Sequence, residues 1–292
     1  MSEYDYNLKP YQKHVFWLVF LALFINVIIF SSVIYFVRSQ SLMNDYKEKL
    51  KGIAISVTKN ISAEAHENIK TINQQDIPEY LEIESYFQTI IIGNPEIDDI
   101  YTLRPTNDPN IMTFVVAGQE SGDRNNDNFI DESELRPDIG EEYDVSDLPE
   151  LKNGLLGPSA DQSFTTDKWG TWLSGYAPIR DKNGNSVALV GIDYPAESII
   201  HTLNTELIMI LAATAALCLV SLLVAYILSK VLSRPLKIMA DGLRRLSHGD
   251  FSHQLPLKKS KSERMFVDLF NKVANMFENE LEHEKKMHNN EE

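Results

Sequence analysis

Two long apolar stretches constrain the fold of this chain more than any other feature. Residues 15–37 and residues 207–228 contain no Asp, Glu, Lys or Arg. A helix needs about 20 apolar residues to cross the hydrocarbon core of a bilayer, and only a helix satisfies its own backbone hydrogen bonds there. The first stretch is also longer than the apolar part of a cleaved signal peptide. The sequence therefore predicts two transmembrane helices, at 15–37 and 207–228.

Positive charge is distributed unevenly around the second stretch. No Lys or Arg occurs in residues 183–206, whereas five follow the stretch closely: Lys230, Arg234, Lys237, Arg244 and Arg245. Basic residues near the ends of a membrane span stay on the cytoplasmic side. We therefore expect a protein of the plasma membrane or bacterial inner membrane. Its N-terminus (1–14) and its C-terminal part are cytoplasmic, and residues 38–206 lie outside.

The external segment is strongly acidic. Residues 38–206 carry 13 Lys and Arg against 30 Asp and Glu. Nucleic acid is excluded as a partner, because binding it requires basic patches. The segment is long enough to form one domain with its own core. Cys218, the only cysteine, lies in the second apolar stretch, so the external domain has no disulfide.

Within the external segment, the apolar pattern changes from helical to strand-like. Apolar residues first recur at three- and four-residue steps, and later fall in short β-rich runs bounded by Pro, Asn and Gly. Asn183-Gly184 supplies the turn that a tight hairpin needs. The expected elements are helices at 40–72 and 78–92, strands at 97–103, 111–116, 170–179 and 186–194, and a helix at 195–204 leading into the second span. The fold class is therefore α+β with an antiparallel sheet.

The last two expected strands carry a recognisable sequence. Residues 169–181 read WGTWLSGYAPIRD, Asn183-Gly184 follows, and residues 190–193 read VGID. This pattern resembles the closing hairpin of Cache sensor domains, which are extracytoplasmic relatives of PAS domains on bacterial chemoreceptors, sensor kinases and cyclases. The resemblance extends over about residues 40–205. It implies a small-molecule pocket on one face of the sheet, and it does not identify the molecule.

Five residues are candidates for contact with that ligand. Trp169, Trp172 and Tyr176 are aromatic residues of the expected hairpin. Arg104, at a strand end, could hold a carboxylate through two hydrogen bonds, and Asp193 could hold an amine. The alternative interpretation is that the aromatic residues belong to the core, the arginine to the surface, and the aspartate caps the next helix.

A calcium-binding loop is expected at residues 123–134. Oxygen-bearing residues occupy the spacing of an EF-hand loop, which ends in a bidentate glutamate. The expected ligands are Asp123, Asn125, Asp127, the backbone carbonyl of Phe129, Asp131 and Glu134. Asn128 replaces the usual glycine, and asparagine tolerates the left-handed conformation required there. We expect a structural Ca²⁺, and the alternative is an acidic surface turn without an ion.

Two amphipathic helices are expected after the second span. Their apolar residues recur at steps of three, four and three, as in a coiled-coil seam. The first helix carries Pro235, Leu236, Met239, Leu243 and Leu246, and the second carries Glu263, Phe266, Leu269, Val273 and Met276. With Gly249-Asp250-Phe251 between the helices, residues 229–282 resemble a HAMP domain, which implies a dimeric coiled coil. The alternative is an ordinary membrane-proximal coiled coil, and residues 283–292 form a polar tail.

These features together predict a non-enzymatic transmembrane sensor. An external small molecule shifts the population of two states of the outer domain, and the second span relays the change to the HAMP-like helices of a homodimer. The output lies on another chain, a cytoplasmic or membrane signalling partner. Two alternatives remain. One is the sensor part of a histidine kinase, a diguanylate or adenylate cyclase or a chemoreceptor, whose output domain lies outside this chain. The other is a module that modulates a partner without sensing a small molecule.

Overall fold

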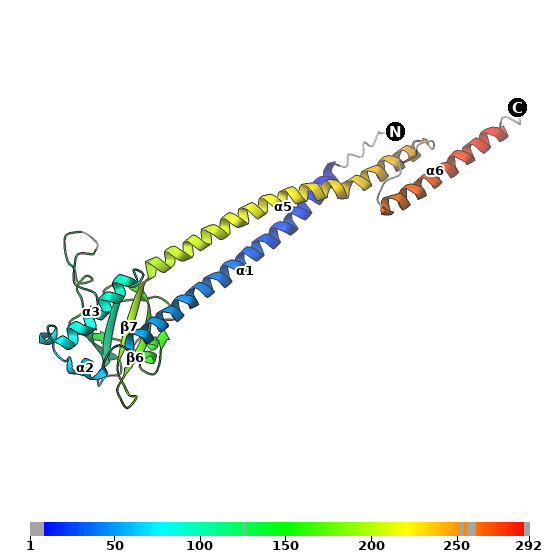
Figure 1. Cartoon of the computed structure of the whole chain (residues 1–292). Coiled ribbons are helices and arrows are strands. Elements are labelled where there is room, and N and C mark those ends of the chain that lie inside the picture. The colour runs from blue at the N-terminus through cyan, green and yellow to red at the C-terminus, as the bar shows by residue number, and fades with distance from the viewer. Residues whose placement is uncertain (1–8, 125–126, 251–253, 256–260, 289–292) are drawn as a thin grey trace. The chain divides into compact units, whose positions relative to one another are not determined.

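A computed structural model describes residues 9–124, 127–250, 254–255 and 261–288. The chain divides into two compact units, which are described separately (Figure 1). One unit comprises Ile34–Met209. The other comprises Met1–Val33 together with Ile210–Glu292. The first unit is a mixture of helices and one antiparallel sheet, so the predicted α+β class is confirmed.

Two long helices contain the predicted membrane spans. Helix α1 comprises Lys9–Thr58 and helix α5 comprises Ala196–Ser247. Both are long and apolar enough to cross a membrane by length and composition. Large apolar side chains such as Phe30 and Leu219 are exposed along them, as expected of side chains that face lipid. Helix α5 begins directly after the sheet, which confirms the helix expected to lead into the second span.

The sheet of the Ile34–Met209 unit has the strand order β3-β2-β1-β7-β6-β4, and β5 pairs with β6. The strands are β1 Asp99–Pro105, β2 Ile111–Ala117, β3 Glu142–Asp144, β4 Ser159–Ala160, β5 Thr165–Thr166, β6 Thr171–Arg180 and β7 Ser186–Pro195. All pairs are antiparallel. Gly184, with φ of 87°, lies in the turn between β6 and β7 and confirms the predicted hairpin.

The predicted single helix at 40–72 is wrong at its C-terminal end. Helix α1 ends at Thr58, and the side chain of Ser62 accepts a hydrogen bond from the backbone of Ala65 to cap a new helix. A serine cap favours a new start over continuation of the helix. The remaining helices are α2 Ala63–Asn68, the 3₁₀ turn η1 Ile72–Gln74, α3 Pro78–Gly93 and α4 Pro149–Gly154. Helix α3 confirms the helix expected at 78–92.

Both faces of the central sheet are covered. Strand β7 is buried at almost every position, which requires apolar cover on each side. Leu50 of α1 and Phe87 of α3 belong to the core on one face, where α3 lies across the sheet (Figure 1). Tyr101, Phe114 and Leu151 belong to a second, smaller core. This smaller core borders the site described below.

The C-terminal helices pack mostly through residues outside the predicted seam, although Leu246 of the seam packs against their small core. Helix α6 comprises Lys261–His288 and contributes Val267, Phe270 and Ala274 to a small core with Leu255. Of the predicted seam residues, five are exposed: Leu236, Leu243, Leu269, Val273 and Met276. Met239 and Leu246 are half-buried. The side chains of Glu263 and Phe266, and all of Phe251, lie outside the described residues.

Pro235 is placed differently from the expectation that it precedes a new helix. It lies inside α5, which is a single helix from Ala196 to Ser247. Helix α5 ends shortly before Gly249, whose φ is 84°, so the predicted break at this glycine is confirmed. The exposed seam and the buried small core together give these two helices two apolar faces, and the described residues cover one of them.

Candidate functional site

A cavity lies beside the smaller core, at one end of strands β1 and β7. Its wall combines aromatic and acidic side chains: Tyr101, Phe114, Tyr143, Trp169, Trp172, Asp98, Asp99, Asp167 and Asp193. The cavity has a volume of about 30 Å³ and opens to solvent. The cavity is therefore open at one end and narrow inside.

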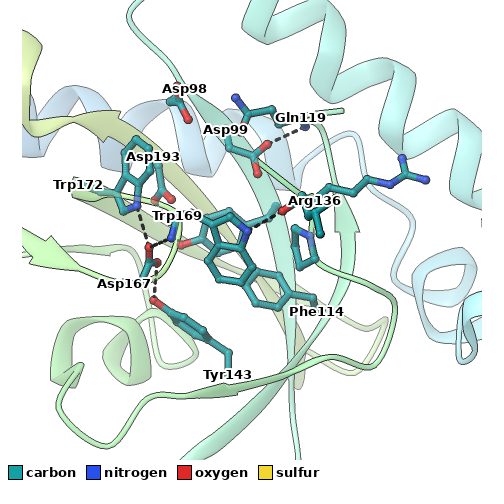
Figure 2. A pocket seen from close by; sticks show the side chains of 13 residues that line it. Asp98, Asp99, Phe114, Gln119, Arg136, Tyr143, Asp167, Trp169, Trp172 and Asp193 are labelled. Atoms are coloured by element: carbon teal, nitrogen blue, oxygen red, sulfur yellow. Dashed lines mark hydrogen bonds between the residues drawn. The ribbon is translucent and has the colours of Figure 1, made fainter. Parts of the chain in front are cut away.

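The aromatic wall is a packed cluster centred on Phe114. Its ring centroid lies 5.5 Å from that of Tyr101, 5.3 Å from that of Tyr143 and 5.2 Å from that of Trp169. The indole nitrogen of Trp169 donates a hydrogen bond of 2.7 Å to the backbone oxygen of Leu135 (Figure 2). Edge-to-face packing of this kind fixes ring positions, so the wall has a defined shape.

Asp167 organises the aromatic wall from within. One carboxylate oxygen accepts hydrogen bonds from the backbone of Trp169 and Gly170 and from the indole of Trp172, at 2.9, 3.1 and 3.2 Å. The other accepts from the hydroxyl of Tyr143 at 3.0 Å (Figure 2). Four donors compensate the charge of this carboxylate. Asp167 is therefore a positioning residue for the rings.

Asp193 is the most buried aspartate of the cavity, with 7% of its surface exposed. Tyr101 donates a hydrogen bond of 3.2 Å to it. Gly191, which pairs with Tyr101 across the strands, makes this contact possible, because a Cβ atom there would lie 2.4 Å from the tyrosine ring. Burial raises the pKa of Asp193 well above its usual value, since the site lacks the solvation that a charge requires.

Asp98 and Asp99 bring two further carboxyl groups to the cavity at the start of β1. Asp99 accepts hydrogen bonds from the backbone of Ile100 and Gln119, at 2.7 and 2.8 Å. Burial nevertheless raises the pKa of Asp99 to about 7. Burial also raises the pKa of Asp98, although Arg124 lies 3.6 Å from its carboxylate. The cavity thus gathers two carboxyl groups whose charged form is disfavoured by burial.

Arg136 lines the cavity, but its guanidinium points away from the interior. Its guanidinium contacts Glu84 at 2.5 Å and Gln75 at 3.2 Å, and Figure 2 shows the side chain extending away from the aromatic wall. Among the described residues that line the cavity, no other Lys or Arg occurs. The lining therefore offers hydrogen-bond acceptors and acidic groups, and the one guanidinium among the described lining residues points away from them.

Three of the five residues expected to contact a ligand line this cavity: Trp169, Trp172 and Asp193. Arg104 lies elsewhere, because its guanidinium donates to the backbone oxygens of His66 and Ile69 and so holds helix α2. Tyr176 is 2% exposed and donates to Asp161. Neither Arg104 nor Tyr176 lines the cavity.

Sequence analysis did not identify the other cavity residues. The Asp98-Asp99 pair in a β-rich run was a usable signal, because aspartates are seldom buried unless a partner compensates them. Phe114, Tyr143 and Asp167 carry no such signal. They reach the cavity from β2, β3 and the loop before β6, and only the folded sheet brings these segments together.

The predicted calcium loop has several features of a folded turn. The carboxylate of Asp123 accepts hydrogen bonds from the backbone of Asp127 and Asn128, at 3.1 and 2.9 Å. Asn128 has a φ of 70°, the conformation for which the family pattern uses glycine. Glu134 is 3% exposed and accepts from the backbone of Arg124 at 2.8 Å.

The loop is not gathered around an ion position. Within the described part of the chain, no three His, Cys, Asp or Glu side chains come close enough to hold a metal. Asn125 lies outside the described residues. The backbone of Phe129 and the side chain of Asp131 remain predicted ligands, and Ser133 hydrogen-bonds Asp131 and lowers the pKa of its carboxyl.

Comparison with known proteins gives limited matches. No protein-family model matches the chain. Over 111 residues the chain is 28% identical to a probable methyl-accepting chemotaxis protein of Bacillus thuringiensis subsp. konkukian. The matched part is 38% of this chain and covers 19% of that protein. The chain therefore spans only a small part of the relative's length.

Solved sensor domains are similar at lower identity. The ligand-binding domain of the Campylobacter jejuni chemoreceptor Tlp3, in complex with L-valine, is 12% identical with a TM-score of 0.41, covering 64% of this chain and 66% of that one. The Escherichia coli DcuS sensor domain is 14% identical with a TM-score of 0.31, covering 54% and 96%. What the cavity of the present chain accepts is set by its own side chains.

Proposed function

We propose that this chain is a two-span membrane receptor whose external domain senses a small molecule. The ligand occupies the cavity lined by Phe114, Trp169, Trp172 and Asp193. One observation carries the proposal most directly. Asp193 is separated from the first residue of α5, Ala196, by only two residues. A ligand that moves the end of β7 therefore acts on the helix that contains the second apolar stretch.

Signal relay follows from the same connection. A ligand that prefers one of two arrangements of β7 shifts the population of both β7 and α5. The resemblance to Cache and HAMP domains supports this order of events. In our proposal a homodimer forms through the exposed seam around Leu243 and Leu269, and the cytoplasmic helices repack when α5 moves. Both chain termini are cytoplasmic in this arrangement, and the output lies on a signalling partner or a further segment.

We also propose that residues 123–134 bind a structural Ca²⁺. The positive φ of Asn128 and the burial of Glu134 support this assignment. Ion binding would draw the carboxylates of Asp123, Asp127 and Glu134 together, and external calcium loops bind at about 10⁻⁴–10⁻³ M. The loop ends next to Leu135, whose backbone oxygen holds the indole of Trp169. An ordered loop would therefore steady one wall of the cavity.

The sensing proposal is tested with the full chain in nanodiscs. Amines, amino acids and small carboxylates are screened for an increase in melting temperature and for a change in tryptophan fluorescence, because two of the three Trp residues line the cavity. Leu135→Trp fills the cavity mouth from a position that is 46% exposed, and Leu81→Trp makes the same change at 45% exposure outside the cavity. A ligand should stabilise the wild type and Leu81→Trp but not Leu135→Trp.

Two outcomes of the same screen would contradict the proposal. If no molecule of any charge class stabilises the wild type more than Leu135→Trp, the cavity is not a sensing site. Equal stabilisation of Leu135→Trp and Leu81→Trp by every active molecule leads to the same conclusion. In either case the chain is better described as a membrane module that modulates a partner.

A further inference from the structure

We propose that the cavity binds a primary ammonium group, on an amine that carries no carboxylate beside its nitrogen. This inference rests on the proposed function and adds the chemical class of the ligand. Asp193 accepts the hydrogen bonds of the ammonium group, and the aromatic wall contacts the carbon chain behind it. Charge, available space and the lack of an inward-facing base each support this class.

The charge of the cavity selects a cation. Asp98, Asp99, Asp167 and Asp193 all line it. Asp167 is compensated by four donors and Asp98 by Arg124. In the described structure no Lys or Arg forms an ion pair with Asp99 or Asp193. A buried carboxylate without a partner is unfavourable, whereas one that meets a cation and a hydrogen-bond donor is stabilised.

The space inside the cavity selects a small cationic group. The cavity has a volume of about 30 Å³, far below the roughly 300–1,000 Å³ of a pocket that encloses a drug-sized ligand. It therefore suits an ammonium group with a short carbon chain. The rings of Tyr101 and Trp172 also favour a cation, since the aromatic face carries negative charge density.

The absence of an inward-facing base excludes a zwitterion. An α-amino acid needs a donor for its carboxylate next to the acceptor for its amine. Arg136 is the one base among the described lining residues, and it is held by Glu84 and Gln75 outside the aromatic wall. A carboxylate beside the ligand nitrogen would instead face Asp98 and Asp99. We therefore expect discrimination between an amino acid and the amine that remains when its carboxylate is removed.

The test compares molecules that differ in one group. Isobutylammonium and L-valine share a carbon skeleton apart from the carboxylate, and isovalerate replaces the ammonium with a carboxylate. Tetramethylammonium is a cation without an N–H donor. Straight-chain amines from ethylamine to pentylamine cover other tail lengths. Stabilisation of the full chain in nanodiscs is measured for the wild type, for Asp193→Asn and for Asp147→Asn, an exposed aspartate outside the cavity.

Asn resembles a protonated Asp in shape and can still accept from Tyr101, so Asp193→Asn should fold. We expect at least one primary amine of the series to stabilise the wild type and Asp147→Asn, with an affinity about 10- to 100-fold lower in Asp193→Asn. L-valine, isovalerate and tetramethylammonium should have little effect. If none of the amines shows an Asp193-dependent shift, the inference is wrong.

The outcome also separates this inference from the proposed function. Should L-valine or isovalerate stabilise the chain in a way that Leu135→Trp abolishes, the cavity is a sensing site and its assigned ligand class is wrong. Should no molecule act through the cavity, the proposed function itself fails. Tetramethylammonium binding as tightly as the primary amines would contradict the role of N–H donation.

Discussion

At the scale of single residues, burial favours the protonated form of two carboxyl groups in the cavity. Burial raises the pKa of Asp99 to about 7 and raises the pKa of Asp193 well above its usual value, because it disfavours the charged form of each. Asp99, Asp161 and Asp167 face Asp193 and add to this effect. A bound cation reverses the balance, because it stabilises the ionised carboxylate. Ligand binding should therefore release a proton and strengthen as the pH rises.

The ligand-free protein should lose stability as the pH rises. The folded state holds protons on Asp99 and Asp193 that the unfolded chain releases above about pH 4. The stabilisation from Asp99 is therefore lost from about pH 4 to about pH 7, and that from Asp193 is lost as the pH rises through its raised pKa. The amide that replaces the carboxyl group in Asp193→Asn does not titrate. The decline in melting temperature between about pH 7 and pH 8 should thus be smaller in Asp193→Asn than in the wild type.

His66 is the reason for choosing the upper part of that pH range. Burial lowers its pKa to about 3, so its contribution to stability is lost as the pH falls below about 6.5. Above about pH 7 the histidine is neutral in both states and does not interfere. If the melting temperatures of wild type and Asp193→Asn decline equally with pH over this range, Asp193 is already ionised in the folded protein.

At the scale of elements, the β6–β7 hairpin and strand β1 together position the site. The pairing of Tyr101 with Gly191 places the tyrosine ring over β7, where its hydroxyl reaches Asp193. Gly191→Ala should displace the ring, and overpacking of this kind costs about 1–3 kcal/mol. Gly157→Ala is a matched control, because nothing lies within 4 Å of a Cβ atom there.

Urea unfolding of the two glycine variants tests this arrangement. Gly191→Ala should unfold at a lower urea concentration and should bind ligand more weakly, whereas Gly157→Ala should behave like the wild type. Equal stability of Gly191→Ala and wild type would mean that the ring moves without cost, and that the contact between Tyr101 and Asp193 does not hold the site together.

The loop at residues 123–134 gives a second prediction at this scale. Calcium should raise the melting temperature of the full chain, and the double variant Asp123→Ala with Glu134→Ala should lose the shift. Asp108→Ala with Glu120→Ala is the control, because it removes equal charge from the neighbouring segments. A calcium shift of the same size in both double variants, or none in the wild type, would identify the loop as an acidic turn.

Local sequence patterns predicted the longer elements, missed the short elements η1, β3, α4, β4 and β5, and predicted the site only in part. The alternation and turn residues of the hairpin follow from neighbouring positions, so β6, β7 and Gly184 were predicted correctly. The end of α1 was missed because its apolar pattern continues to Ile61, whereas the break depends on a single cap at Ser62. Arg104 looked like a ligand contact, yet its partners are backbone oxygens of a helix that sequence patterns had merged with α1.

At the scale of the whole molecule, the proposed signal relay requires two copies of the chain. The seam residue Leu243 is 57% exposed, and an apolar stripe of this kind is stable when a second copy covers it. In a Cys218→Ser background, Leu243→Cys should form crosslinked dimers in membranes. Asp241→Cys, which lies on the opposite side of the same helix, should crosslink less. Monomers alone at Leu243→Cys would contradict the dimeric arrangement.

The measurement that tests the central claim most directly is the crosslinking rate of Leu243→Cys with and without the primary amine that stabilises the wild type most. If the cavity controls the C-terminal helices, the amine should change the rate, and adding Asp193→Asn should abolish the change while leaving the basal rate of dimer formation intact. Two other results of the crosslinking measurement would contradict this claim. A rate unaffected by the amine, or changed to the same extent in Asp193→Asn, would contradict the proposed path from Asp193 through α5 to the C-terminal helices.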